Sequence, residues 1–280
     1  EQDMVTIKTP EKLLFPKEGS KAFKGHEFFE ASSIRKYDGK YYFVYSSRLN
    51  HELCYAVSDF PTEGFVYRGT LVSNGDIFPE KNMSEKTARN YTGNNHGGML
   101  RIKDQYYIFY HRQTNQNSYS RQTCAEKLVR DADGNFLQAE MTSCGLNDGW
   151  LKGEGIYEAR IACNLWSKEG TGRYDVGNPK KLLKEHPYIT QDKKDGDVSA
   201  RQYIANMRDG AVAGFKYFEI TESTNIAIWL SGAGKGEMEV SDTPDFGKSV
   251  FIPVLVDSLN TKCFQAELPE VYGKTALYFR

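Results

Sequence analysis

Two side chains able to exchange protons, Glu30 and His96, occupy nearly equivalent positions in two similar segments of the chain. Glu30 lies twelve residues before Tyr42, and His96 lies eleven residues before Tyr107. Glu30 is flanked by the aromatic and small residues of segment 28–33, a setting that can raise the pKa of a carboxyl group, as a general acid requires. Glu30 is therefore a candidate proton donor. The alternative is a solvated glutamate at the start of a strand.

His96 and Arg121 are further candidates for contact with a ligand. His96 stands in the glycine-rich segment 92–98, where the glycines allow close approach of the backbone. A lone histidine is a poor signature of a metal site, so a hydrogen-bonded loop histidine is the alternative. Arg121 follows segment 110–112, and its guanidinium can hold sugar hydroxyls or make a surface ion pair. The sequence contains no nucleophile elbow and no phosphate-binding loop.

Composition and charge favour a neutral partner. The 280 residues include 36 Lys and Arg against 37 Asp and Glu, which gives a net charge of -1. This balance argues against nucleic acid and against a polybasic membrane contact. No apolar stretch approaches the ~20 residues of a membrane helix. The five cysteines lack C-x-x-C spacing, and most are expected to be buried thiols.

The elements expected to position these residues are short β-strands, which occur in two similar segments of the sequence. Segment 38–45 (DGKYYFVY) is matched by segment 103–110 (KDQYYIFY), and each is typical of a turn followed by a strand. Further strands are expected at 32–37, 53–58 and 65–71 around the first copy, and at 99–102, 123–129 and 136–141 around the second. An Asp133-Gly134 hairpin would precede the last of these.

The sequence therefore predicts an all-β protein in which residues 1–150 form blades of a β-propeller. Two four-stranded units and an N-terminal stub amount to about two to three blades, whereas a propeller needs about four to eight. The missing blades are expected upstream or in a second chain. Residues 151–179 are expected to be a connection, and residues 180–280 a β-sandwich. Its strands are expected at 214–220, 224–230, 237–240, 250–256, 263–268 and 275–279.

Taken together, these segments resemble glycoside hydrolase family 43, the five-bladed β-propeller hydrolases of arabinan, xylan and their side chains. Residues 29–36 (FEASSIRK) followed by 39–46 (GKYYFVYS) resemble the general-acid segment of that family. Residues 95–99 (NHGGM) with 106–112 (YYIFYHR) resemble its last-blade segment. The resemblance covers roughly residues 1–165.

The resemblance implies a role for each candidate. Glu30 would be the catalytic general acid, and Arg121, Phe29 and Ser46 would bind the substrate. His96 would reach the channel centre, toward a calcium ion or water, and no organic cofactor is expected. The family inverts configuration with a carboxylate pair ~6.5 to 9.5 Å apart. Its base and a second, acid-tuning aspartate both lie upstream of the glutamate, so this chain lacks them.

Residues 180–280 resemble a family 6 carbohydrate-binding module, with 275–280 (TALYFR) as its closing strand. Modules of this kind bind sugars on exposed aromatic rings. Tyr203 and Trp229 are the candidates for such a surface.

The expected function is therefore inverting hydrolysis of plant cell-wall polysaccharide, of the α-L-arabinofuranosidase or β-D-xylosidase type. The partner would be a neutral oligo- or polysaccharide such as xylan, arabinoxylan or arabinan. Such substrates imply a secreted or periplasmic protein. Two alternatives stay open: a non-catalytic carbohydrate-binding protein with a truncated propeller, and a fragment held by the other blades in a two-chain assembly.

Overall fold

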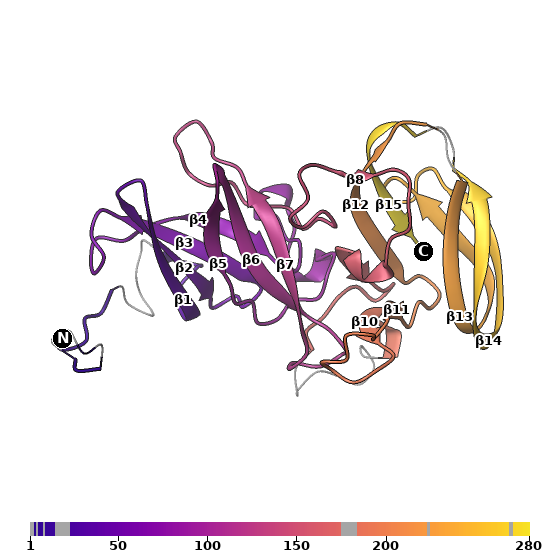
Figure 1. Ribbon diagram of the computed structural model, residues 1–280, viewed down its shortest axis with the longest axis horizontal. Coiled ribbons are helices and arrows are strands. Elements are labelled where there is room, and N and C mark those ends of the chain that lie inside the picture. Colours follow the sequence, from indigo (N-terminus) through magenta and orange to yellow (C-terminus); the bar gives the residue numbers. More distant parts are fainter. Residues whose placement is uncertain are drawn as a thin grey trace.

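The structure is a computed structural model, which describes residues 3, 5–7, 9–14, 23–174, 184–222, 225–268 and 271–280. The secondary structure of these residues is almost entirely β, as predicted. Figure 1 shows a four-stranded sheet, a three-stranded sheet and a larger C-terminal sheet following one another along the long axis. In the part of the chain that the structure describes, no helix has the length and apolar character needed to cross a membrane.

The first sheet is the expected four-stranded unit. It contains β1 (Phe28–Tyr37), β2 (Lys40–Ser47), β3 (Glu52–Ser58) and β4 (Val66–Ser73), antiparallel and in chain order. Tyr37 pairs with Lys40, so Asp38 and Gly39 form a two-residue hairpin loop, and both have positive φ. This is the conformation that a type I′ hairpin requires and that the Asp-Gly sequence favours.

The second sheet has three strands, β5 (Gly98–Ile102), β6 (Gln105–Gln113) and β7 (Arg121–Leu128). It follows two short 3₁₀ helices, Pro79–Lys81 and Glu85–Thr87. The three strands agree with the predicted segments, whereas the predicted fourth strand at 136–141 is wrong. The turn at Asp133-Gly134 forms, and an isolated bridge joins Arg130 to Phe136.

Beyond Phe136 the chain leaves the second sheet and runs to the first. The Ala139 N–H donates to the Leu71 carbonyl at the edge strand β4. The cause is the buried ring of Phe136, whose centroid lies 5.1 Å from that of Tyr106 and 5.8 Å from that of Tyr55. Phe136 thus fills the space between the two sheets, and this packing overrides the local strand pattern.

One apolar core joins the two sheets face to face. It contains buried side chains from both sheets and from segment 136–141: Tyr42, Val44, Leu53, Tyr55, Leu71, Met99, Ile108, Tyr110, Leu128, Phe136 and Met141. A second cluster around Phe43, Tyr45 and Phe65 covers the opposite face of the first sheet. The first sheet is therefore buried on both faces, as expected of a sheet stacked between neighbours. The described strands do not close a ring.

The C-terminal strands form one six-stranded sheet. It contains β8 (Leu151–Lys152), β9 (Asn164–Trp166), β12 (Val212–Ile220), β13 (Asn225–Ser241), β14 (Val250–Glu267) and β15 (Gly273–Phe279). The order is β14-β13-β15-β12-β8, with β9 also pairing to β12. The hairpin of β10 (Tyr188–Gln191) and β11 (Gln202–Ala205) stands apart from this sheet.

This arrangement differs from two expectations. Residues 151–179, expected as a connection, include β8, the 3₁₀ helix Ala159–Ile161 and β9, and both strands pair with β12. The expected boundary at 179–180 lies outside the described residues. The pairs of short strands expected at 224–230 and 237–240, and at 250–256 and 263–268, are each one continuous strand. Pairing between β13 and β14 continues beyond the irregularity at Leu230/Gly232, so the sandwich prediction is not confirmed.

A buried ion pair connects the C-terminal sheet to the two blade-like sheets. Lys216 of β12 places its Nζ 2.7 Å from Asp76 Oδ2 and 2.8 Å from Glu140 Oε1. The side chains of Lys216 and Asp76 are only 3% and 4% exposed. Asn164 of β9 donates to the same Asp76 oxygen at 3.0 Å. The sheets therefore meet through a charged contact shielded from solvent.

Candidate active site

Glu30 lies at an irregular point of β1. The pairing between β1 and β2 shifts register on both sides of Glu30, and Ala31 has a φ of 60°. Such a bulge bends a strand and redirects its side chains. Glu30 is paired with Ser46 of β2, and 36% of its side chain is exposed. The first sheet therefore presents a carboxylate that solvent or a ligand can reach.

His96 approaches Glu30 from the loop before β5. Its Nε2 atom lies 2.9 Å from Glu30 Oε1, and Asn94 Nδ2 donates to the same oxygen at 3.4 Å. Gly97 allows this approach, because a Cβ atom there would lie 1.9 Å from the carbonyl oxygen of Phe109 on β6. The equivalent positions of Glu30 and His96 in the two similar segments thus bring the two side chains together.

His111 of β6 holds the backbone of His96. The His96 N–H donates to His111 Nε2 at 3.1 Å, and the two rings meet edge to face, with centroids 5.3 Å apart. Burial, together with the nearby Arg121 and His96, lowers the pKa of His111 to about 4. His111 is therefore neutral near pH 7. Its Nε2 is the acceptor, so the ring proton resides on Nδ1.

Arg121 lies near the group formed by Glu30, His96 and His111. It begins β7 opposite Gln113, and it is close enough to act on the pKa of His111. Burial lowers the pKa of Arg121 itself. Its Nη1 donates to the Ser120 carbonyl at 3.3 Å. Among the described residues no carboxylate pairs with Arg121, so the surface ion pair that was its alternative role is not observed there.

Ser46 of β2 and Phe29 of β1 belong to the same hairpin as Glu30. Ser46 is fully buried, and its Oγ has no hydrogen-bond partner within the described part of the chain. The ring of Phe29, next to Glu30 in β1, is 42% exposed. A polar group without a partner and an exposed ring thus belong to the two residues next to Glu30, across the hairpin and along the strand.

The described surroundings of His96 do not by themselves fit a calcium ion. Calcium takes six to eight oxygen ligands, and the ring nitrogen of His96 is bonded to the carboxylate of Glu30. The group of three potential metal ligands found in the described residues is elsewhere, at His26, Glu52 and Cys54.

The sequence alone does not distinguish His111 within segment 110–112, or Asn94 within segment 92–98, as members of the site. The alternation of side chains along β6 does carry a signal for His111, because His111 lies on the same face of the strand as Phe109. Gly97, next to His96, packs against the carbonyl group of Phe109.

The group formed by Glu30, His96 and His111 is suited to proton transfer at a partly exposed carboxyl. One oxygen of Glu30 is held by His96 and Asn94. His96 is held in turn by a neutral His111. A carboxyl fixed in this way can present its other oxygen to an incoming ligand.

The chain is similar in sequence to curated bacterial glycosidases. It is 44% identical over 281 residues to a xylosidase/arabinosidase of Thermoclostridium stercorarium, a match that covers 99% of this chain and 59% of that protein. It is 34% identical over 113 residues to a beta-xylosidase of Xylanibacter ruminicola, covering 40% of this chain and 31% of that protein. No protein-family model matches the chain.

Among solved structures, a glycoside hydrolase family 43 arabinoxylan arabinofuranohydrolase from Bacillus subtilis, in complex with cellotetraose, aligns with 90% of this chain and 50% of its own. The sequence identity is 20% and the TM-score 0.41. The chain spans about three fifths of the Thermoclostridium protein. It is thus a relative, over nearly its whole length, of part of a xylosidase/arabinosidase.

Proposed function

We propose that residues 1–280 are part of an inverting glycosidase of the family 43 type, an α-L-arabinofuranosidase or β-D-xylosidase. The observation that carries this proposal is the contact of 2.9 Å between Glu30 and His96, which fixes a partly exposed carboxyl. The 44% identity to a xylosidase/arabinosidase supports the class of reaction. The substrate would be a neutral plant cell-wall polysaccharide such as xylan, arabinoxylan or arabinan.

In this proposal Glu30 donates a proton to the glycosidic oxygen as the bond to the sugar breaks. A carboxylate from blades upstream, or in a second chain, activates water on the opposite face of the sugar, ~6.5 to 9.5 Å away. Arg121, Ser46 and Phe29 hold the sugar beside Glu30. His96 keeps the Glu30 carboxyl oriented, and a calcium ion near His96 stays a prediction. Secretion or a periplasmic location follows from the size of the substrate.

The test is Glu30→Gln in the intact protein that contains this chain. Loss of a general acid should lower kcat by about 10²- to 10⁴-fold for xylosides and arabinosides with poor leaving groups. The loss should be much smaller for aryl glycosides, whose leaving groups need little protonation.

Glu27→Gln is the matched control, because Glu27 is three residues away and its carboxylate accepts a hydrogen bond from Gly25 N–H, which an amide oxygen can also accept. Equal kcat values for Glu30→Gln and the unaltered protein on poor leaving groups would rule out Glu30 as the acid.

A second candidate function is carbohydrate binding without hydrolysis. The observation that favours it is the exposure of two aromatic rings on C-terminal strands, Tyr203 of β11 at 43% and Trp229 of β13 at 54%. Retention on insoluble xylan, reduced by Trp229→Ala and unaccompanied by release of reducing sugar, would favour this function.

The intact mass under denaturing conditions would show whether a second chain supplies the other blades.

A further inference from the structure

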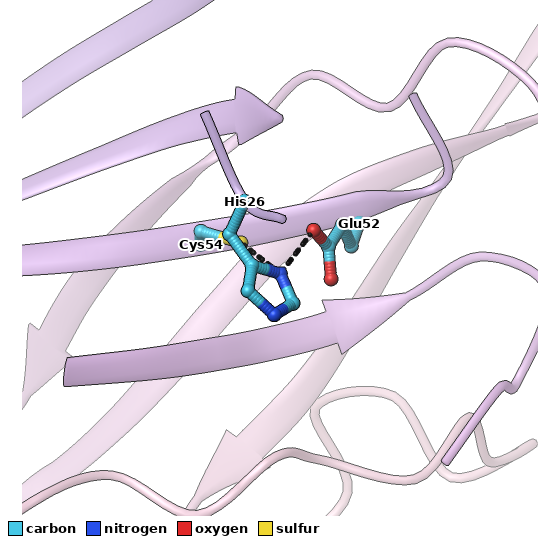
Figure 2. Close-up of side chains that lie close together, drawn as sticks. All are labelled: His26, Glu52 and Cys54. Atoms are coloured by element: carbon cyan, nitrogen blue, oxygen red, sulfur yellow. Dashed lines mark hydrogen bonds and ion pairs between the residues drawn. The ribbon is translucent and has the colours of Figure 1, made fainter. Parts of the chain in front are cut away.

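A group of three potential metal ligands lies on the face of the first sheet that is turned away from the second sheet. Glu52 and Cys54 are two residues apart on β3, so their side chains emerge on the same face. His26 comes from the loop just before β1 and covers that face. Figure 2 shows the carboxylate and the thiol converging on His26 Nδ1.

The distances between these atoms are close to those within a metal site. His26 Nδ1 lies 2.7 Å from Glu52 Oε1 and 3.8 Å from Cys54 Sγ, and all three donor atoms lie within 4.8 Å of one another. Around a tetrahedral zinc ion, with bonds of 2.0–2.3 Å, neighbouring donor atoms are about 3.3–3.6 Å apart. For zinc geometry the distance from His26 Nδ1 to Glu52 Oε1 would have to lengthen and that to Cys54 Sγ would have to shorten slightly.

The surroundings hold each side chain in place. The ring of Tyr67 stacks on that of His26 at 5.0 Å, and the Tyr45 hydroxyl donates to the His26 carbonyl at 2.7 Å. Thr70 donates to Glu52 Oε2 at 2.8 Å. Partners of this kind orient metal ligands and raise the affinity of a site.

Burial and access also suit a bound ion. Glu52 and Cys54 are 3% and 0% exposed, so a metal bound to them would be shielded from competing water. The side chain of His26 is 28% exposed, which leaves a path from the surface to the group.

The alternative is a hydrogen-bonded pair of His26 and Glu52 with an inert buried thiol beside it. That arrangement accounts for the contact of 2.7 Å. In that arrangement the sulfur of Cys54 makes weak hydrogen bonds, to His26 at 3.8 Å and to Thr70 at 3.6 Å, and interacts with Glu52 and Tyr67.

We propose that His26, Glu52 and Cys54 bind a divalent transition metal, with zinc as the ion that fits best. One thiolate, one imidazole and one carboxylate make a mixed set that zinc accepts and that calcium and magnesium do not favour. With three protein ligands, water completes the coordination. The ion ties the loop before β1 to β3, four residues ahead of Glu30, and this inference does not depend on the proposed glycosidase activity.

The test is a titration of the intact, chelator-treated protein with Zn²⁺ and, separately, Co²⁺. The expected result is one bound metal per chain, together with a thiolate-to-cobalt charge-transfer absorption in the near ultraviolet. Cys54→Ser should abolish that absorption, and His26→Asn should weaken binding at least tenfold. Thr70→Val, which removes the hydrogen bond to Glu52, should weaken it about 10- to 100-fold.

Cys263→Ser is the matched control, because Cys263 is exposed on β14 and far from the group. Circular dichroism of each variant establishes that the fold is retained. If Cys54→Ser does not fold, a second measurement replaces it. In the unaltered protein, added Zn²⁺ should protect the Cys54 thiol from alkylation. A cobalt spectrum without a thiolate band, or one that Cys54→Ser leaves unchanged and Cys263→Ser removes, overturns the proposal.

Discussion

His96, in the loop before β5, contacts Glu30 of β1, with Nε2 2.9 Å from Oε1, although the two residues are 66 positions apart in the sequence. Each side chain is supported from its own side. Glu30 stands at a bulge of β1, and His96 is held through its backbone by His111. The position of the carboxyl therefore depends on the spacing between two sheets, and changes in that spacing should alter activity.

Replacement of His96 by alanine should lower kcat on natural linkages by about tenfold to a hundredfold, because a hydrogen bond to a charged group is worth about 1.5–3 kcal/mol. His96→Gln retains a side-chain donor and should recover part of the rate. Steady-state kinetics with xylosyl and arabinosyl substrates measures both. Equal rates for His96→Ala and the unaltered protein would show that the contact has no part in the reaction.

Gly97→Ala should destabilise the protein by about 1–3 kcal/mol or more, because the new Cβ would lie 1.9 Å from the Phe109 carbonyl oxygen and force the backbones apart. Gly236→Ala is the control, since a Cβ atom there meets nothing within 4 Å. Urea unfolding followed by fluorescence compares the two variants. Similar midpoints would mean that the loop moves aside without cost.

Glu126 should make the protein less stable as the pH rises. Burial raises the pKa of Glu126 to about 8, while its ordinary value is 4.5. A raised carboxyl pKa gives stability that is present in full below about pH 4.5 and is lost as the pH rises to about 8. The slope is at most about 1.4 kcal/mol per pH unit.

Glu126→Gln is expected to remove this pH dependence and keep stability near pH 7. An amide can still accept hydrogen bonds from Thr142 N and Tyr110 at one atom and donate to Thr142 Oγ1 with the other. Denaturant unfolding between pH 5 and pH 9 tests this. The prediction is wrong if the variant and the unaltered protein show the same pH slope.

Lys216→Met should destabilise the protein by about 3–5 kcal/mol, because it leaves Asp76 charged and buried without its cation. Adding Asp76→Asn to this variant should cost less than the sum of the single changes, since the two groups interact directly. Lys262→Met, at an exposed pair with Asp257, should cost no more than about 1 kcal/mol. Thermal unfolding of the four variants decides whether the contact between sheets is important for stability.

The strands of the first sheet could be predicted because their signals are local. Segment 38–45 begins with an Asp-Gly turn and continues as aromatic and β-branched residues, and both features appear as expected in β1 and β2. The strand predicted at 136–141 failed for a tertiary reason. Phe136 packs between Tyr55 and Tyr106, which belong to different sheets, and no local pattern indicates that contact.

The candidate site could be predicted only for the residues that occupy equivalent positions in the two similar segments of the chain. Glu30 and His96 were found because they precede similar segments. His111 was missed because its importance lies in a bond to the backbone of His96. The group at His26, Glu52 and Cys54 lacks the spacing typical of zinc sites, since the loop before β1 brings His26 to β3 only in the folded chain.

The position of β15 has a consequence for the order in which the chain assembles. β15 lies between β12 and β13 in the sheet, yet the ribosome makes it roughly fifty residues after the end of β12. At about 5–20 residues per second, β12 must wait several seconds for its neighbour. During that interval β8 and β9, both already synthesised, can pair with one edge of β12, while the edge that later receives β15 stays open to other nascent chains.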